Sequence, residues 1–300
     1  MERLAAHLEQ YPGTCLAEAA HTLEMGRRDF AHRSFVVAVD AQQAAQALRE
    51  PSGTRQHARQ TPASKPRLVF LFPGQGAQYK GMGRGVYEAL PECREAMERC
   101  FAALQGFADF DLRARMFGDD PAALLQTEVT RPATFCLEYA LASAWLARGL
   151  APEALIGHSV GEFVAATLAG VMSLEDAIRL VTKRGALMQA LPAGGMLSVR
   201  LSAAELEPML PPELQLAAEN GPKACVVAGA NKAIDAFERQ LSLRDVSARR
   251  LLTSHAFHSA MMEPAVPVFE QAVRAIRLAP PKIPIVSTVT GDWLTPEQAT

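Results

Sequence analysis

The sequence has almost no excess of charge of either sign, which narrows the possible partners. Its 300 residues carry 30 lysines and arginines against 32 aspartates and glutamates, a formal net charge of -2. Proteins that bind nucleic acid usually present a surplus of basic residues. We therefore expect no nucleic-acid partner, and a few local residues must bind any carboxylate or phosphate.

Cysteine is sparse and unpaired in pattern. The five cysteines include no C-x-x-C pair and are scattered, at Cys15, Cys93, Cys100, Cys136 and Cys225. Neither a disulfide framework nor a zinc site is indicated, which favours a reducing compartment. No metal site is expected.

Long apolar runs are also missing. No run reaches transmembrane length, and the N-terminal "MERLAAHLEQ" carries charges at once and has no apolar signal-peptide core. With 49% hydrophobic and 21% charged residues, the composition is that of a globular protein. We expect a cytoplasmic protein without a membrane segment.

The first 66 residues predict a small mixed unit followed by a connector. Helices are expected over 2–9, 16–25 and 41–50, and a strand is expected in "SFVVAVD", 34–40. The following polar, proline-bearing stretch, 51–67, has the composition of a connector. We place a domain boundary near Arg67.

The remainder, 67–300, predicts an α/β domain with a parallel sheet. The buried strands "RLVFLF" and "ALIG" each run into a glycine-containing turn, and helical patterns cover 85–102 and 132–148. Between about 195 and 254 the predicted elements follow the β-α-β-β-α-β order of a ferredoxin-like unit. The chain then returns to the main sheet at "IPIVST".

The stretch "LIGHSVGE" makes Ser159 a candidate nucleophile. A serine on a tight strand-to-helix turn projects its hydroxyl beside free backbone N–H groups at the helix N-terminus. Glycine and serine are also ordinary turn residues, so the pattern by itself allows a purely structural role.

A glycine-rich turn, "FPGQGAQYKGMG" (72–83), follows the first buried strand. It lacks G-K-[ST], and Tyr79 stands where a third glycine of G-x-G-x-x-G belongs, so nucleotide binding is poorly supported. Its backbone either passes close to Ser159 and supplies an oxyanion N–H or merely bends the chain.

The next helix, "SLEDAIRLVTKRG", should begin after Ser173 as N-cap and end at Gly185. Its apolar stripe includes Arg184. A buried guanidinium needs a protein carboxylate, a group of backbone carbonyls or a ligand carboxylate as partner.

Two histidines lie three apart in "TSHAFHSAMMEP", where the chain leaves the inserted unit. Either is a possible base for Ser159. The H-x-x-H spacing also suits a metal, but no carboxylate or cysteine nearby completes a ligand set.

Taken together and in order, "FPGQGAQYKGMG", "GHSVGE", "RLVTKRG" and "HAFHS" resemble the acyltransferase domains of modular polyketide synthases, which are related to malonyl-CoA:acyl carrier protein transacylases. The stretch 16–38 resembles the linker that follows the ketosynthase in such synthases. The resemblance implies an α/β-hydrolase-like core with an inserted ferredoxin-like subdomain, preceded by a small α/β linker domain.

The resemblance also implies site roles. Ser159 would take the acyl group as an ester, His258 would be its base, and backbone N–H groups of Gln75 and Val160 would form the oxyanion hole. The donor would be malonyl-CoA, the acceptor the phosphopantetheine thiol of an acyl carrier protein, and no cofactor would be bound. A neighbouring ketosynthase is an implied partner.

Substrate recognition is assigned in the same way. Arg184 would hold the free carboxylate, and His158 is a further contact candidate. His255 and Phe257 belong to the H-A-F-H form typical of malonyl-specific members, in which the phenylalanine fills the space of an α-methyl group. Arg131, in "TRPA", replaces a glutamine of the usual T-Q-P-A near the pocket.

The family continues beyond "GDWLTPEQAT" with a segment whose backbone carbonyl orients the catalytic histidine, so we expect impaired activity without it. Two other functions stay open: a serine hydrolase of thioesterase type, and a non-catalytic docking module of a synthase.

Overall fold

The computed structural model describes residues 1–50, 56–61, 66–76, 78–120 and 122–299. The chain divides into two compact units, Met1–Arg67 and Leu68–Thr300. No helix in the described ranges is both long and apolar enough to span a bilayer.

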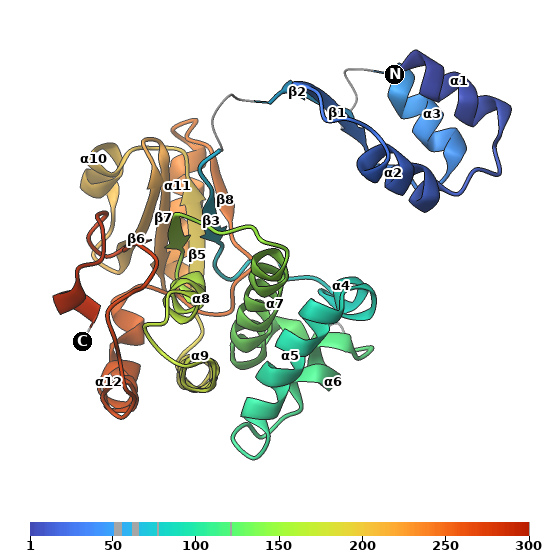
Figure 1. Ribbon diagram of the computed structural model, residues 1–300. Coiled ribbons are helices and arrows are strands. Elements are labelled where there is room, and N and C mark those ends of the chain that lie inside the picture. The colour runs from blue at the N-terminus through green and yellow to red at the C-terminus, as the bar shows by residue number, and fades with distance from the viewer. Residues whose placement is uncertain (51–55, 62–65, 77, 121, 300) are drawn as a thin grey trace. The chain divides into compact units, whose positions relative to one another are not determined.

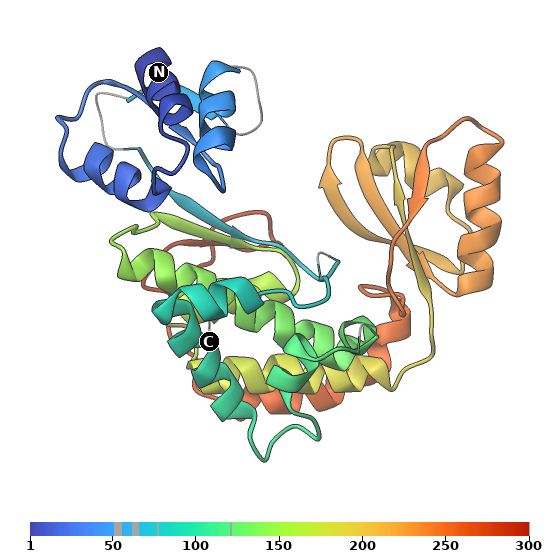
Figure 2. The same ribbon diagram turned by 90° about the vertical axis from the view of Figure 1, so that its right-hand side faces the viewer.

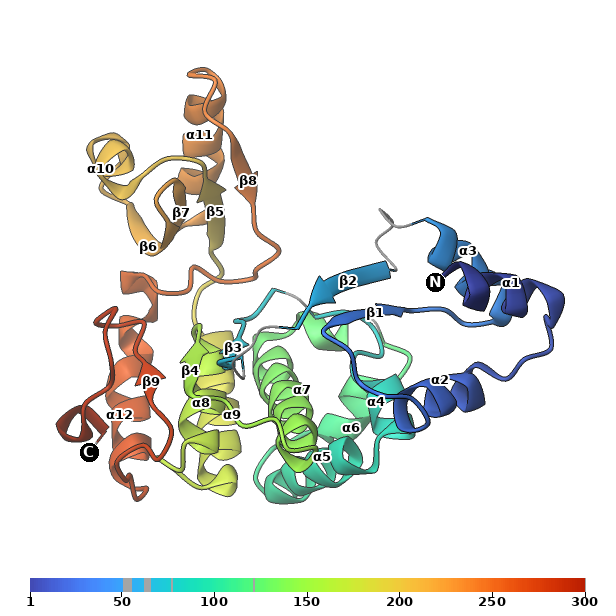
Figure 3. The ribbon, with the colours of Figure 1, turned by 45° about the horizontal axis from the view of Figure 1, so that its top comes forward.

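The first unit is centred on two helices that pack through alanine and leucine side chains. α1 (Glu2–Gln10) lies against α3 (Ala41–Arg49), with Leu8, Ala45 and Leu48 buried between them. α2 (Leu16–Met25) and an antiparallel pair of strands complete the unit (Figure 3).

The strands of this unit differ from the sequence-based expectation. β1 covers His32–Val36 instead of 34–40, and β2 (Gln56–Gln60) pairs with it inside the predicted connector. Since ladder hydrogen bonds come from the backbone, a polar stretch without apolar periodicity can form a strand. Residues 51–55 and 62–65 of the connector lie outside the described ranges.

The second unit is built around a parallel sheet in the order β3-β4-β9 (Figure 3). The strands are β3 (Val69–Phe72), β4 (Ala154–Gly157) and β9 (Ile285–Val286). Phe72 pairs with Gly157, so the glycine-rich turn and the Ser159 turn leave the sheet at the same level. The return of the chain at "IPIVST" is confirmed by the pairing of β9 with β4.

Helices surround this sheet (Figure 1). Apart from α12, their apolar faces share one core with the strands, which includes Val129, Phe135, Leu155 and Ile178. The α-helices are α4 (Arg84–Ala89), α5 (Pro91–Leu104), α6 (Leu112–Phe117), α7 (Thr127–Ala147), α8 (Val160–Leu168), α9 (Leu174–Gln189) and α12 (Val266–Arg274). The short 3-10 helices are η1 (Ala123–Leu125), η3 (Ala260–Ala265) and η4 (Pro296–Ala299).

The helices predicted over 85–102 and 132–148 differ from the observed ones. The helix expected over 85–102 is two helices that meet at Leu90 and Pro91, because proline is favoured at the first position of a new helix. α7 begins at Thr127, five residues before the predicted start, and carries Pro132 inside it. As a result Arg131 lies within a helix.

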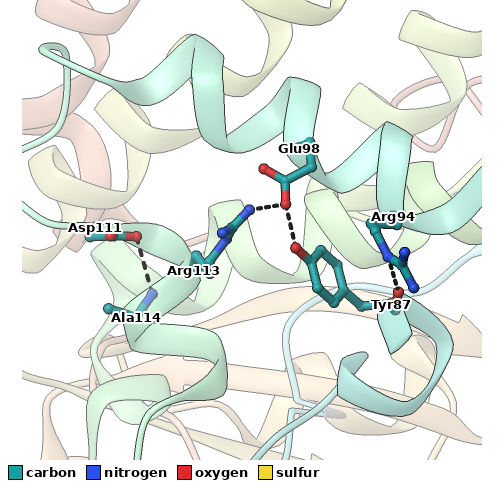
Figure 4. A network of polar contacts seen from close by, with 6 residues as sticks. All are labelled: Tyr87, Arg94, Glu98, Asp111, Arg113 and Ala114. Atoms are coloured by element: carbon teal, nitrogen blue, oxygen red, sulfur yellow. Dashed lines mark hydrogen bonds and ion pairs between the residues drawn. The ribbon is translucent and has the colours of Figure 1, made fainter. Parts of the chain in front are cut away.

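Figure 4 shows the polar network that joins α4, α5 and α6. Glu98 accepts a hydrogen bond from the Tyr87 hydroxyl and pairs with Arg113. The Arg113 guanidinium lies 5.6 Å from the centre of the Tyr87 ring. Asp111 caps α6 by accepting from the backbone N–H of Ala114, 3.1 Å away. These contacts hold together short helices that are weak in isolation.

α9 does not end at Gly185, contrary to the sequence-based expectation. Ser173 is the N-cap as predicted, since its hydroxyl accepts from the N–H of Asp176, but the helix continues to Gln189. A Cβ at Gly185 would lie 2.9 Å from the Cα of Glu128, so this glycine permits close packing of α9 on α7.

Gly185→Ala should therefore destabilise the fold. The added methyl group has to displace the α7 backbone, which we expect to lower the free energy of unfolding by about 1–3 kcal/mol. In an unhindered helix the same change from glycine to alanine would raise it by about 1 kcal/mol. Urea unfolding monitored by circular dichroism measures the difference. An unchanged or raised midpoint would contradict the packing role of Gly185.

The inserted unit has the ferredoxin-like topology that the sequence predicted. Its antiparallel sheet has the order β6-β7-β5-β8, and the unit is the yellow-to-orange part of Figure 2. α11 (Asn231–Ser242) and α10 (Ala203–Leu206), which continues into η2 (Glu207–Met209), pack on one face. The strands are β5 (Gly195–Val199), β6 (Leu214–Gly221), β7 (Ala224–Gly229) and β8 (Ala248–Arg250).

The opposite face of this sheet packs against the segment that follows β8. Met196, Val226 and Ala228 from the strands share a small apolar cluster with Phe257 and Met262. The inserted unit thus supports the segment that carries the two candidate histidines.

Candidate active site

Ser159 lies on a strained turn between β4 and α8. Its backbone has φ 55° and ψ -108°, in the positive-φ range that non-glycine residues rarely adopt. A Cβ at Gly157 would overlap the backbone of Gly161, and a Cβ at Gly161 would overlap the carbonyl oxygen of Phe72. Both glycines are therefore needed for the turn to sit on the sheet.

The glycine-rich turn after β3 passes directly beside this serine. A Cβ at Gly74 would lie 2.8 Å from Nδ1 of His158 and 3.5 Å from Cβ of Ser159. The backbone N–H of His158 also donates to the carbonyl of Phe72, 2.8 Å away. Gln75 follows Gly74 and Val160 follows Ser159, so the two predicted oxyanion residues each adjoin the meeting point of the turns.

His258 approaches Ser159 from the other side. Its Nε2 lies 3.1 Å from the Ser159 Oγ, across 99 residues of sequence. The backbone of His258 also has a positive φ, of 57°. A contact of 3.1 Å is within the reach expected between a nucleophile and its base. Strained backbones such as those of Ser159 and His258 are common at functional sites.

The surroundings of His258 disfavour its protonation. By surface area His258 is exposed to the cleft, yet the protein atoms packed around the ring displace water and lower its pKa to about 4, and the positive charges of Arg184 and Arg131 and the neighbouring His158 act in the same direction. The imidazole is therefore neutral near pH 7. If Nε2 accepts the hydroxyl proton of Ser159, Nδ1 carries the ring hydrogen.

Arg184 projects from α9 into the same cleft. Its guanidinium lies 5.8 Å from the centre of the Phe163 ring. Burial lowers the pKa of Arg184, and the charge of Glu162 opposes that shift. Within the described ranges no ion pair joins Arg184 to a carboxylate, and Glu162 accepts from the backbone N–H of Thr288, 2.8 Å away.

The cleft has a volume of about 760 Å³. Ser159, His158, Arg184 and His258 line it, and its wall is largely apolar. The apolar wall includes Phe163, Leu187, Met188, Met262, Val266, Phe269 and Val273. A site of this kind offers one cation, one nucleophile and room for an extended ligand.

Three other predicted site residues lie behind the wall. Arg131 is only 1% exposed, and its guanidinium lies 4.9 Å from the centre of the Phe257 ring. Its Nε and Nη1 have no hydrogen-bond partner among the described residues. Burial, followed by the charge of Arg184, lowers its pKa well below the usual value. Phe257 and His255 are buried too, and none of the three is among the described residues that line the cleft.

Sequence reasoning missed the polar contacts around the loop that carries His255 and His258. Thr127 at the start of α7, Gln189 at the end of α9 and Ser254 beside His255 interact across 62 and 127 residues. No local motif signals such pairs. In the described ranges, His, Cys, Asp and Glu side chains form no group of three or more that could hold a metal.

The sequence model of the family described as acyl transferase domain matches residues 69–299. A second model, described as CurL-like, PKS C-terminal, matches residues 1–48. The mycoketide-CoA synthase of Mycobacterium tuberculosis H37Rv is 39% identical over 294 aligned residues, which cover 97% of this chain and 7% of that protein. Polyketide synthase GfsA of Streptomyces halstedii is 35% identical over 300 aligned residues, which cover 97% of this chain and 4% of that protein. The chain thus spans a small part of the length of these relatives.

Two solved structures are similar over most of their length. The acyl transferase domain of SpnD, solved in complex with 2-(pent-4-yn-1-yl)malonyl, has a TM-score of 0.88 and 38% identity over 100% of this chain and 72% of its own. A malonyl CoA-acyl carrier protein transacylase from Clostridium perfringens has a TM-score of 0.69 and 29% identity, covering 76% of this chain and 74% of its own.

Proposed function

We propose that this chain, which belongs to the acyl transferase domain family, moves a malonyl group from coenzyme A to the phosphopantetheine thiol of an acyl carrier protein. The observation that carries the proposal is the 3.1 Å contact between Ser159 Oγ and His258 Nε2 in a cleft that also holds the Arg184 cation. The pair supplies acyl-transfer chemistry, and the cation selects a carboxylated acyl group.

The first half-reaction forms an acyl-enzyme. Nε2 of His258 accepts the hydroxyl proton as Ser159 Oγ attacks the thioester carbonyl carbon. The carbonyl oxygen becomes an oxyanion, which the N–H groups of Gln75 and Val160 stabilise in our proposal. The carbon–sulfur bond then breaks, and His258 returns the proton to the departing coenzyme A thiol, which leaves a malonyl ester on Ser159.

The second half-reaction runs the same steps toward the carrier protein. His258 accepts the proton of the phosphopantetheine thiol, and the sulfur attacks the ester carbon. Ser159 leaves and recovers its proton from His258. The order is ping-pong, and His258 is in the neutral form near pH 7 that can accept a proton at the start of each half-reaction.

Arg184 is assigned to the free carboxylate of the malonyl group. A guanidinium can form two parallel hydrogen bonds to a carboxylate, and Arg184 has no competing ion pair in the described ranges. His158 lines the cleft beside the nucleophile and is a second contact candidate.

Phe257 is assigned to the exclusion of an α-methyl branch. It is 4% exposed, packed with Met188 and Met262 and covered by the Arg131 guanidinium. Phe257 lies behind Met188 and Met262, which do line the cleft, so it limits how far this part of the wall can move outward. A site packed in this way rejects one methyl group by about 1–3 kcal/mol. Malonyl should therefore be preferred over methylmalonyl by roughly ten- to a few hundred-fold.

We further assign residues 1–66 to the linker and its connector and 67–300 to the acyltransferase domain, with the ferredoxin-like subdomain at about 195–254. The carrier protein and neighbouring synthase domains such as a ketosynthase are the proposed partners. No bound cofactor is required by this chemistry.

Intact-protein mass spectrometry after brief incubation with malonyl-CoA, methylmalonyl-CoA or acetyl-CoA tests the proposal. A stable malonyl adduct that passes to an acyl carrier protein supports it. Rapid release of free malonate would favour the hydrolase of thioesterase type. Absence of an adduct with every donor would favour the docking module.

Arg184→Ala should lose malonyl loading selectively. Loss of hydrogen bonds to a charged group costs about 1.5–3 kcal/mol, so malonyl loading should slow by roughly 10- to 150-fold while acetyl loading changes little. Lys183→Ala removes a neighbouring cation that does not line the cleft and is the matched control. Equal losses with both donors would remove the carboxylate role.

A further inference from the structure

A chain of hydrogen bonds passes through His255, three residues before His258. Thr127 Oγ1 lies 3.1 Å from Ser254 Oγ, and Ser254 Oγ lies 2.8 Å from His255 Nδ1. His255 Nε2 lies 3.1 Å from the carbonyl oxygen of Leu191. Thr127 and His255 are 0% and 3% exposed and Ser254 is half-buried, so these contacts are largely removed from water.

The direction of every bond in this chain follows from its last acceptor. The Leu191 carbonyl only accepts, so His255 Nε2 carries a hydrogen and donates it. For a neutral ring, Nδ1 then accepts from the Ser254 hydroxyl, and the Ser254 oxygen accepts from Thr127. One tautomer of His255 satisfies all three bonds.

The chain joins three parts of the fold. Thr127 begins α7, Leu191 follows the end of α9, and Ser254 and His255 belong to the loop after β8. A further bond from the Thr127 N–H to Gln189 Oε1, 2.7 Å, ties α7 to α9. The Ser254 carbonyl also accepts from the N–H of Gly194, 3.1 Å away.

The loop needs this support because His258 is strained. A non-glycine residue at positive φ is strained and persists only where its surroundings hold it. On the other side of the turn, Ser259 Oγ donates to the carbonyl of Ala256, 2.7 Å away. The His255 ring also lies stacked near the ring of Phe257, with centres 6.1 Å apart.

We propose that His255 is a positioning residue: through the chain Thr127–Ser254–His255–Leu191 it fixes the loop that carries Phe257 and His258, without touching the acyl group. The inference rests on the proposed role of His258 as the base. It gives His255 a different role from the substrate contact expected from its place in the H-A-F-H stretch.

The two roles predict different kinetics. A lost substrate contact raises the malonyl-CoA concentration at half-maximal acylation. A displaced base lowers the maximal acylation rate and leaves that concentration unchanged. It also slows any other reaction of Ser159 that depends on His258, including labelling by a small fluorophosphonate that carries no malonyl group.

Thr127→Val tests the chain with little change of shape, because it removes only the donor hydroxyl. We expect fluorophosphonate labelling of Ser159 and maximal acylation by malonyl-CoA to slow about 3- to 30-fold. Thr127→Ser keeps the hydroxyl and should stay within about twofold of the wild type. Because both groups belong to one chain, the double variant Thr127→Val/Ser254→Ala should be no slower than Ser254→Ala.

His255→Ala should show the same loss of rate, and the Thr127 pair decides the matter if this variant fails to fold. Wild-type rates in Thr127→Val, or a raised half-saturating concentration with an unchanged maximal rate in His255→Ala, would overturn the positioning role. Failure of the proposed function is distinguishable, since the wild type would then react with the fluorophosphonate but form no malonyl ester.

Discussion

Ser159→Ala should abolish the malonyl adduct and lower transfer to the carrier protein by on the order of 10⁶-fold, the size of loss seen when an activated serine is removed. Alanine retains the Cβ and adopts the same positive-φ turn about as well as serine, so the fold should persist. The variant therefore separates chemistry from folding.

Mass spectrometry of the intact protein measures the adduct, and thermal melting checks the fold. Ser242→Ala, at the exposed end of α11, is the matched control and should load malonyl normally. An adduct that persists in Ser159→Ala at the wild-type rate would assign the nucleophile to another residue.

His258→Ala should slow acylation of Ser159 by about 10²- to 10⁴-fold, the usual contribution of a general base. The 3.1 Å contact with Ser159 Oγ and the neutral state of the ring give the physical reason. Single-turnover acylation with excess malonyl-CoA measures the rate, and His21→Ala, at an exposed position in α2, serves as control. A loss below threefold would remove His258 from the proton transfers.

The pH profile tests the same residue without mutation. Burial, helped by Arg184, Arg131 and His158, lowers the pKa of His258 to about 4, so the base is neutral above that pH and protonated below it. Acylation should stay nearly constant from pH 8 to about 5 and decline as the pH falls through about 4. A midpoint near 6.5, the ordinary histidine value, would mean that the ring is solvated in the working enzyme.

The same shift affects folding stability with a definite sign. The folded-state pKa is depressed below 6.5, so between about pH 6.5 and 4 the unfolded chain binds the proton more readily than the folded one. Stability therefore falls as the pH falls through this window. Each rate at low pH requires a circular dichroism spectrum recorded under the same conditions.

Local patterns were sufficient for several elements. The strand, turn and helix around Ser159, the N-cap Ser173 and the β-α-β-β-α-β order of the inserted unit follow from short-range backbone preferences and apolar periodicity. The fold class deduced from these patterns is the one observed. The motifs also indicated which side chains carry the chemistry.

Where a local pattern competed with packing, packing prevailed. A glycine at position 185 predicts a helix end, yet α9 continues past it to Gln189. The glycine is needed there for another reason, since α7 lies too close to leave room for a side chain. Pro132 predicts a helix start, yet α7 begins earlier at Thr127 and places Arg131 in the interior. The neighbours that decide these outcomes are distant in sequence.

The sequence by itself determined the fold class, the family resemblance and the candidate residues Ser159, His258 and Arg184. Only the tertiary structure decided that Ser159 and His258 meet across 99 residues. It also decided that Nδ1 of His255 contacts Ser254 while Nε2 contacts Leu191. The physical reason is range: turns and caps depend on neighbouring residues, whereas burial, pKa shifts and hydrogen-bond direction depend on groups that only the folded chain brings together.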